Sequence, residues 1–129
     1  MDASESYVSL FQQISVMLFS SELIKGTLKT IVLKLLADNK RMYGYEITQK
    51  VKELTRDRIL ITEGALYPTL HALEADGLVV TELEYIGKRV RKHYKLTPSG
   101  KSKTKEKVSE LIEFMQTMHV LLDINLQTS

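Results

Sequence analysis

The chain has 129 residues, of which 43% are hydrophobic and 26% are charged, and this composition is typical of one soluble globular domain. It contains no cysteine, which excludes disulfide bonds, thiolate metal sites and cysteine nucleophiles. The formal net charge is +2, but nine of the eighteen Lys and Arg residues lie between Lys88 and Lys107, and residues 1–24 and 111–129 have none. This asymmetry indicates a polyanionic partner for one face, although a solvated Lys-rich surface explains it equally well.

Neither a membrane span nor a signal peptide is expected. No apolar run reaches the roughly 18–20 residues that cross a bilayer. The first residues include Asp2 and Glu5, and no Lys or Arg precedes Lys25, which is unlike the basic start of a signal peptide. We therefore expect a cytoplasmic protein.

Patterns for catalysis and metal binding are also absent from the sequence. The histidines, His71, His93 and His119, fall on separate predicted elements and lack metal-ligand spacing. The chain has no nucleophile elbow, phosphate-binding loop or pair of carboxylates spaced for acid–base chemistry. We expect no enzyme, no metal and no cofactor.

The first predicted element is a helix over residues 5–22. No charged residue lies between Glu5 and Glu22, which is unusual for a helix that faces solvent, so we expect it to pack against something large such as a partner subunit. Residues 21–26 are interpreted as a break. The apolar positions of this helix follow helical spacing and are Tyr7, Leu10, Phe11, Ile14, Met17 and Leu18.

Two more helices follow the break. One begins at Gly26-Thr27 and is predicted to face the core through its apolar positions. The next covers Tyr45–Leu54, and a connection follows in which Ile59 and Ile61 are compatible with a brief β-strand. The predicted buried residues of the two helices are Leu28, Ile31, Val32, Leu35, Leu36, Ile47, Val51 and Leu54.

The stretch from Thr62 to Gly77 is predicted to be a helix with two different faces. Thr62 can cap its start, Gly77 can end it in the left-handed conformation, and Leu66, Leu70 and Leu73 form one apolar stripe. Pro68 lacks a backbone donor, so we expect an irregular first turn or a later start. The opposite side is polar but nearly uncharged and carries Glu63, Tyr67, Thr69 and His71.

Two alternating segments, 79–86 and 90–96, flank the turn Gly87-Lys88-Arg89 and predict a β-hairpin. In the second strand we expect Tyr94 and Leu96 to anchor the hairpin. The other face of that strand is expected to lie outside the core because its residues are basic or histidine, namely Arg89, Arg91, His93 and Lys95.

Thr97-Pro98 predicts the start of a last helix that runs to about Leu122, with a cap followed by proline at the first helical position. Its second half has an apolar seam with intervals of three and four residues, as in a coiled coil, but the seam is too short for a free-standing zipper. We expect it to pair with a second copy. The predicted dimer residues are Leu10, Phe11, Ile14, Leu18, Val108, Leu111, Ile112, Met115, Met118 and Leu122.

The order of elements predicts a mainly α fold with a small β-hairpin wing, namely a winged helix-turn-helix with N-terminal and C-terminal dimerisation helices. Residues 24–97 would bind double-stranded DNA, and residues 1–23 and 98–129 would form the dimer. The predicted DNA contacts are Tyr43, Thr62, Glu63, Gly64, Tyr67, Thr69, His71, Lys88, Arg89 and Arg91.

Several of these assignments have alternatives. Tyr67 could instead pack on the wing, His71 could be merely solvated, and either Tyr43 or Tyr45 could be the outward tyrosine, with Tyr43 preferred. The whole domain could also be a winged-helix module that binds protein rather than DNA, or a ligand carrier. The basic wing favours DNA.

The segments GYEITQKVKEL, EGALYPTLHALEADGLV and HYKLTPSGK resemble the PadR family of winged-helix transcriptional regulators, and the resemblance covers about residues 24–100. It implies a homodimeric repressor of a pseudo-palindromic operator. It also implies that Tyr67, its neighbours and the wing tip touch that operator.

Many members of the family respond to a small aromatic effector. Drug-binding members have a tryptophan in the last helix, where this chain has Leu111, so binding of flat aromatic drugs is in doubt. An effector pocket would be lined by Phe11, Phe114, Met115 and Met118, and the alternative for these residues is ordinary core packing.

Overall fold

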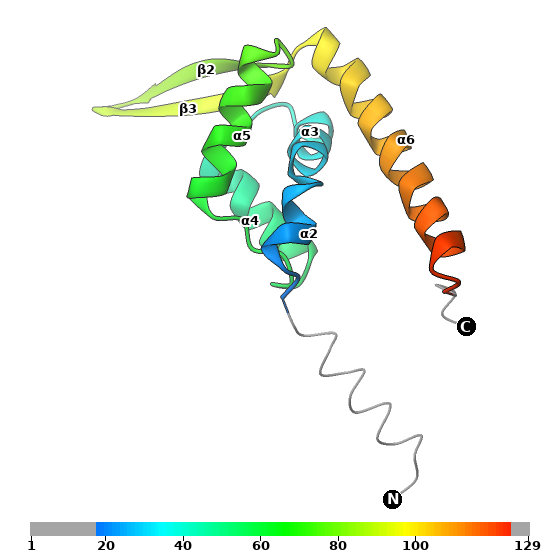
Figure 1. The fold of residues 1–129 in the computed structure, drawn as a ribbon. Helices are drawn as coiled ribbons and strands as arrows, with labels where there is room; N and C mark the ends of the chain where they lie inside the picture. The colour runs from blue at the N-terminus through cyan, green and yellow to red at the C-terminus, as the bar shows by residue number, and fades with distance from the viewer. Residues whose placement is uncertain (1–17, 125–129) are drawn as a thin grey trace, which may run out of the picture.

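The computed structural model describes residues 18–124 and is drawn in Figure 1. Within this range the helices are α2 (Ser21–Lys25), α3 (Leu28–Asp38), α4 (Gly44–Leu54), α5 (Glu63–Ala75) and α6 (Pro98–Leu121). The strands are β1 (Met42–Tyr43), β2 (Val79–Ile86) and β3 (Arg89–Leu96), and they form one antiparallel sheet in the order β1-β3-β2. The predicted fold class, mainly helical with a β-hairpin wing, is confirmed.

The core lies where α3, α4 and α5 pack against the base of the sheet. The stripe on α5 is completely buried, with exposed fractions of 0% for Leu66 and Leu70 and 1% for Leu73. Burying a side chain of this size contributes about 1.5–3 kcal/mol. The other buried apolar residues are Leu28, Val32, Leu33, Leu35, Leu36, Met42, Ile47, Val51, Ile61, Val79, Tyr94 and Leu96.

The connection between α4 and α5 differs from the prediction. Leu54, expected in the core, is 63% exposed, and Ile59 and Ile61 belong to no strand. Arg56 and Asp57 both have positive φ, at 52° and 64°, and they turn the chain sharply after α4. Ile59 and Ile61 therefore reach the core in place of Leu54.

The N-terminal part of the described chain also differs from the prediction. Residues 21–26 were interpreted as a break, but Ser21–Lys25 is the short helix α2, which begins where the Ser20 hydroxyl accepts a hydrogen bond from the Leu23 amide at 3.4 Å. Ser caps a helix in this way because its hydroxyl satisfies an amide of the first turn. Most of the helix predicted over residues 5–22 lies outside the described residues.

Helix α5 runs straight through Pro68, so the predicted irregular first turn is wrong. The Thr62 hydroxyl accepts a hydrogen bond from the Ala65 amide at 3.2 Å, as predicted for a cap. Pro68 has no amide hydrogen to donate to the Gly64 carbonyl four residues earlier. The lost hydrogen bond destabilises the helix little, because Gly64 is exposed to water. At the other end Gly77 has φ 72°, and this confirms the predicted left-handed end of the helix.

The hairpin has the predicted strands and a two-residue loop in which Gly87 has φ 61°. Glycine at the first loop position is typical of tight hairpins, since it adopts positive φ without strain. A short strand that the sequence did not predict, β1, pairs with β3 by placing Met42 opposite Tyr94 and Tyr43 opposite His93.

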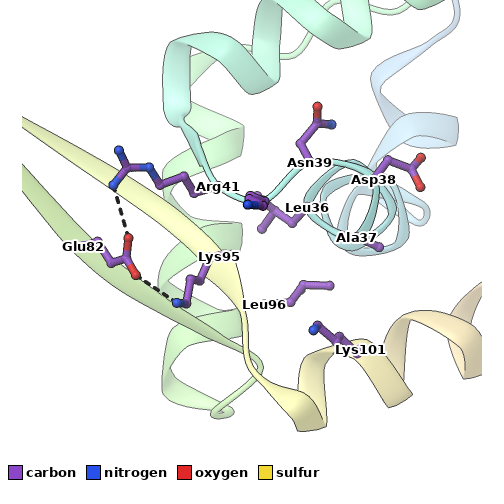
Figure 2. A pocket seen from close by; sticks show the side chains of 10 residues that line it. Leu36, Ala37, Asp38, Asn39, Arg41, Glu82, Lys95, Leu96 and Lys101 are labelled. Carbon is purple, nitrogen blue, oxygen red and sulfur yellow. Dashed lines mark hydrogen bonds and ion pairs between the residues drawn. The ribbon is translucent and has the colours of Figure 1, made fainter.

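Carboxylates from β2 pair with the half of the basic face of β3 that lies nearer the core. Glu82 accepts hydrogen bonds from Lys95 at 2.9 Å and from Arg41 at 3.3 Å, and Figure 2 shows both cations directed at it from either side. The Lys95 hydrogen bond, followed by that from Arg41, lowers the pKa of Glu82 below the ordinary value of 4.5. The face is therefore held by cross-strand ion pairs.

On the same face His93 is buried, at 6% exposed, which corrects the prediction that this side lies outside the core. The His93 Nε2 lies 2.5 Å from the Glu84 carboxylate. The Glu84 carboxylate accepts only, so Nε2 carries the proton.

The start of α6 is tied to the end of α5. The Thr97 hydroxyl accepts a hydrogen bond from the Gly100 amide at 3.0 Å, as expected of a cap, and donates to the Gly77 carbonyl at 2.7 Å. The Thr97 amide also donates to the Leu78 carbonyl at 3.0 Å. This junction fixes the direction in which α6 leaves the core.

Gly100 fits against the same junction, which generates a stability prediction. A Cβ atom at Gly100 would overlap the Leu78 carbonyl oxygen, and that oxygen is held by the Thr97 amide. We expect Gly100→Ala to lower the free energy of unfolding by about 1–3 kcal/mol, as overpacking does, in urea titrations followed by circular dichroism. The control is Gly26→Ala, where a Cβ meets no atom within 4 Å. Equal stability of the two variants would contradict this packing.

The ion pairs of Glu82 generate a prediction about pH. Since the folded-state pKa of Glu82 is lowered, its stabilisation is present above about pH 4.5 and disappears as the pH falls through the folded-state pKa. We expect Glu82→Gln to be less stable than wild type at neutral pH, and the difference to shrink on acidification. Chemical unfolding at several pH values measures this. A difference independent of pH would contradict the ion pairs. Glu53→Gln, at a surface position without an ion pair within residues 18–124, is the control.

Candidate nucleic-acid interface

The first turns of α5 and the hairpin lie on one side of the fold. In Figure 1 the hairpin projects beside α5, away from α6. Thr62, Glu63 and Gly64 at the start of α5 are exposed, and so is His71 two turns later. The buried leucine stripe thus directs the polar residues of α5 outward, as the sequence predicts.

Tyr67 is partly exposed and packs on the start of α4, and a contact from it to DNA stays a prediction. Its side chain is 36% exposed, and its hydroxyl end lies over Gly44 at the start of α4. A Cβ atom placed on Gly44 would be 2.5 Å from the Tyr67 Oη and 2.9 Å from its Cζ. Tyr67 therefore packs across the first turn of α4 while it remains accessible from outside.

The two tyrosines beside Gly44 are placed opposite to the preferred assignment. Tyr45 is 61% exposed, whereas Tyr43 is half-buried. Tyr43 belongs to β1 and shares a sheet face with His93, whose ring meets it edge-on at 5.6 Å. The Arg91 guanidinium lies 4.8 Å above the Tyr43 ring centre. Strand pairing, which the sequence did not predict, decides this placement.

A cavity of about 190 Å³ lies where the start of α4, α5 and β3 meet. Sequence reasoning missed most of its residues, although the glycine between two tyrosines at a predicted helix start was a usable signal. Every lining residue is a tyrosine, a glycine or a cation, namely Tyr43, Gly44, Tyr45, Tyr67, Arg91, Lys92 and Tyr94.

Tyr94 forms the floor of this cavity. It is only 2% exposed, and the Lys92 ammonium lies 5.7 Å from its ring centre. Burial raises the pKa of the Tyr94 hydroxyl, and the nearby Tyr67 and Glu74 add to the shift. The hydroxyl therefore stays protonated at neutral pH and can donate a hydrogen bond.

Thr69 lies apart from this cavity. It is half-buried, and its hydroxyl donates to the Ala65 carbonyl at 3.0 Å within α5. With Pro68 it lines a different groove of about 580 Å³ between α5 and α2. The structure does not bring Thr69 and Tyr67 together at one point, so a contact from Thr69 to DNA stays a prediction.

The cations at the hairpin tip are free of ion pairs. Within residues 18–124, the ion pairs of the sheet use Arg41, Lys95 and His93, and none includes Lys88 or Arg89. Lys88, Arg89 and Arg91 are exposed, as predicted. The positive charge of the wing is therefore concentrated near its tip and not spread along β3.

Four of the ten predicted dimer residues are exposed in a single chain. Leu18, Ile112, Met115 and Leu122 are between 46% and 57% exposed, and Phe114 is 59% exposed. Val108, Leu111 and Met118 are half-buried. Leu10, Phe11 and Ile14 lie outside the described residues.

Neither a membrane-spanning helix nor a cluster of metal ligands is found in the part of the chain that the structure describes. Within residues 18–124 no helix is long and apolar enough to cross a membrane. No group of three or more His, Asp or Glu side chains suited to a metal ion occurs in that range.

Comparison with known proteins identifies relatives of this chain in sequence and in fold. A transcriptional regulator from Mycobacterium tuberculosis is 40% identical over 81 residues, which are 63% of this chain and 72% of that protein. The solved structure of a transcriptional regulator from Clostridium thermocellum is 29% identical, covers 79% of this chain and 96% of that one, and has a TM-score of 0.72. A PadR family transcriptional regulator from Eggerthella lenta is 26% identical, covers 94% of this chain and 99% of that one, and has a TM-score of 0.71.

The model of the transcriptional regulator PadR-like family matches residues 32–106, from the middle of α3 into α6. The match contains the exposed start of α5, the cavity beside it and the hairpin. The relatives and the family are transcriptional regulators and not enzymes, which agrees with the sequence prediction. The chain belongs to the PadR-like family of transcriptional regulators.

Proposed function

We propose that the protein is a homodimeric repressor that binds a pseudo-palindromic operator through α5 and the hairpin. One observation carries this proposal: the exposed, nearly uncharged start of α5 lies on the same side as the unpaired cations of the hairpin tip. A major groove about 12 Å wide admits a helix of this kind, and cations on an adjacent wing neutralise phosphates. Titration of promoter DNA in a mobility-shift assay tests the proposal.

Dimerisation is supported by the apolar residues that α6 exposes in a single chain. A soluble protein rarely leaves such a patch in water, so a partner surface is expected over Ile112, Met115 and Leu122. Two copies related by a two-fold axis would direct their α5 helices into successive major grooves about 34–36 Å apart. We assign DNA binding to residues 24–97 and dimerisation to residues 1–23 and 98–129.

A bound dimer would repress by covering the promoter, and such a regulator acts in the cytoplasm, where the chromosome lies. We further propose that a small aromatic effector binds beside Phe114 and Met115 of α6 and relieves repression. Exposed aromatic and methionine side chains adapt readily to such ligands. Calorimetry with phenolic compounds tests the effector independently of DNA.

The wing generates a prediction about salt. We expect Arg89→Ala to weaken binding to specific and random duplexes by a similar factor, because a phosphate contact does not read sequence. The slope of log K against log salt should become shallower by about 0.9. Lys29→Ala, at an exposed position on α3, is the control and should leave the slope unchanged. An unchanged slope for Arg89→Ala would remove the wing from the interface.

The seam of α6 generates a prediction about assembly. Sedimentation at micromolar concentration should show a wild-type dimer, and Met115→Glu should shift it to the monomer by placing charge in an apolar interface. Met115 is 50% exposed in the single chain, so the variant should still fold. Ser109→Glu, an exposed position outside the seam, should remain dimeric. A wild-type protein that sediments as a monomer would contradict the dimer.

A further inference from the structure

We propose that the cavity between α4, α5 and β3 holds one phosphate of the operator backbone, and that Gly44 is required because it lets Tyr67 close one wall of that cavity. This inference rests on the proposed function and adds to it a defined binding site. It assigns roles to Gly44 and Tyr94, which the sequence pattern did not single out as DNA contacts, and to Tyr45, which was only the alternative to Tyr43.

The lining of the cavity is suited to an anion. Arg91 and Lys92 supply positive charge, and no carboxylate is among the lining residues. The carboxylates of the sheet are paired with other cations, since Glu82 pairs with Lys95 and Arg41, and Glu84 pairs with His93.

The start of α4 supplies hydrogen-bond donors beside the cavity. The first amides of α4 have no partner within the helix, and the start of a helix attracts anions through these donors and its dipole. Glu46 satisfies the Tyr43 amide, which is the residue before the helix, with a hydrogen bond of 3.1 Å. The Gly44 and Tyr45 amides are thereby left for an external acceptor.

Tyr94 gives a second and independent indication of a ligand. The side chain is 98% buried, since only 2% is exposed, and it still lines the cavity. Among residues 18–124 its hydroxyl has no hydrogen-bond partner. A hydroxyl that lines a cavity and has no protein partner can donate a hydrogen bond to a phosphate oxygen placed there.

The position of the cavity identifies the phosphate as one of the DNA backbone. In the proposed complex α5 enters a major groove, and the wing lies at the adjacent minor groove. The backbone of one strand always separates these two grooves. The cavity lies between α5 and the wing strand β3, so it faces that backbone when both elements are engaged.

The contact between Gly44 and Tyr67 makes the site testable without unfolding the protein. The three atoms nearest to a Cβ atom on Gly44 all belong to the outer end of the Tyr67 side chain, so we expect a methyl group there to displace the tyrosine and leave the fold intact. Gly44→Ala and Tyr67→Phe should thus have the same effect by different routes. Gly44→Ala moves the Tyr67 hydroxyl, and Tyr67→Phe removes it.

The experiment uses the full-length protein and a duplex selected for tight binding from random sequences. Each backbone phosphate is replaced in turn by a neutral methylphosphonate. At one position in each half-site we expect the replacement to weaken wild-type binding about tenfold or more, as for a charge-assisted hydrogen bond. Tyr67→Phe and Gly44→Ala should weaken binding to the unmodified duplex. In these two variants the methylphosphonate at that position should weaken binding little further.

Control variants separate this site from the rest of the interface. In Arg89→Ala the methylphosphonate at that position should still weaken binding by the full factor. Gly26→Ala, where a Cβ meets no atom within 4 Å, should bind every duplex as wild type does. If the variants and the methylphosphonate replacements weaken binding by independent factors at every position, the phosphate site is overturned while DNA binding stands. Failure of wild type to bind any selected duplex would overturn the proposed function itself.

A final comparison distinguishes DNA phosphate from free phosphate. Inorganic phosphate at millimolar concentration is added at constant ionic strength, with chloride as the reference. Since the cavity depends on α5 and the wing holding the duplex, phosphate should compete no better than chloride. Specific competition that is lost in Tyr67→Phe would overturn the assignment to DNA and make the cavity a site for a free anion.

Discussion

The burial of one leucine stripe fixes the orientation of α5, and the arrangement of the surface depends on that orientation. Leu66, Leu70 and Leu73 are at most 1% exposed, so a rotation of the helix about its axis would bring apolar surface into water. Each such side chain contributes about 1.5–3 kcal/mol on burial, which is a large share of the net stability of a small domain. The outward direction of Glu63, Gly64 and Tyr67 is a consequence of this burial.

The sheet determines where positive charge is available. A strand with the sequence Arg-Val-Arg-Lys-His-Tyr-Lys suggests a uniformly basic face. At the end of the strand near the core, however, carboxylates of β2 pair with Lys95 and His93. The ion pairs of Glu82 and Glu84 join β2 to β3 and to Arg41, and so hold the hairpin at a defined angle to the core. The unpaired cations remain at the tip, where a phosphate backbone can approach them without desolvating an existing pair.

The beginning of α4 connects the sheet to α5. Strand β1 ends at Tyr43, and Gly44 begins the helix against Tyr67, so one short segment contacts both elements that we propose to face DNA. Tyr43 lies under the Arg91 guanidinium of β3, so the same segment is also in contact with the wing. These contacts give a physical reason for a Tyr-Gly-Tyr segment at that point of the chain, because a side chain at its centre would separate the two.

The main elements follow from local patterns in the sequence, since each is specified by local chemistry. Helical spacing gave α3, α5 and α6, Thr62 and Thr97 marked helix starts, and alternation around Gly87 gave the hairpin. The family resemblance, carried by local motifs, was correct for the same reason. Residue patterns of this kind depend only on neighbours a few positions away.

Tertiary structure alone decided the details that depend on partners distant in the chain. Two positive φ angles after α4 put Ile61 in the core in place of Leu54, and pairing with β3 half-buried Tyr43 and left Tyr45 exposed. The cavity beside Tyr67 combines residues from three separate segments, so the Tyr-Gly-Tyr segment alone does not show which residues complete it. Side-chain exposure and charge neutralisation are set by what packs against a residue, and that becomes known only when the chain is folded.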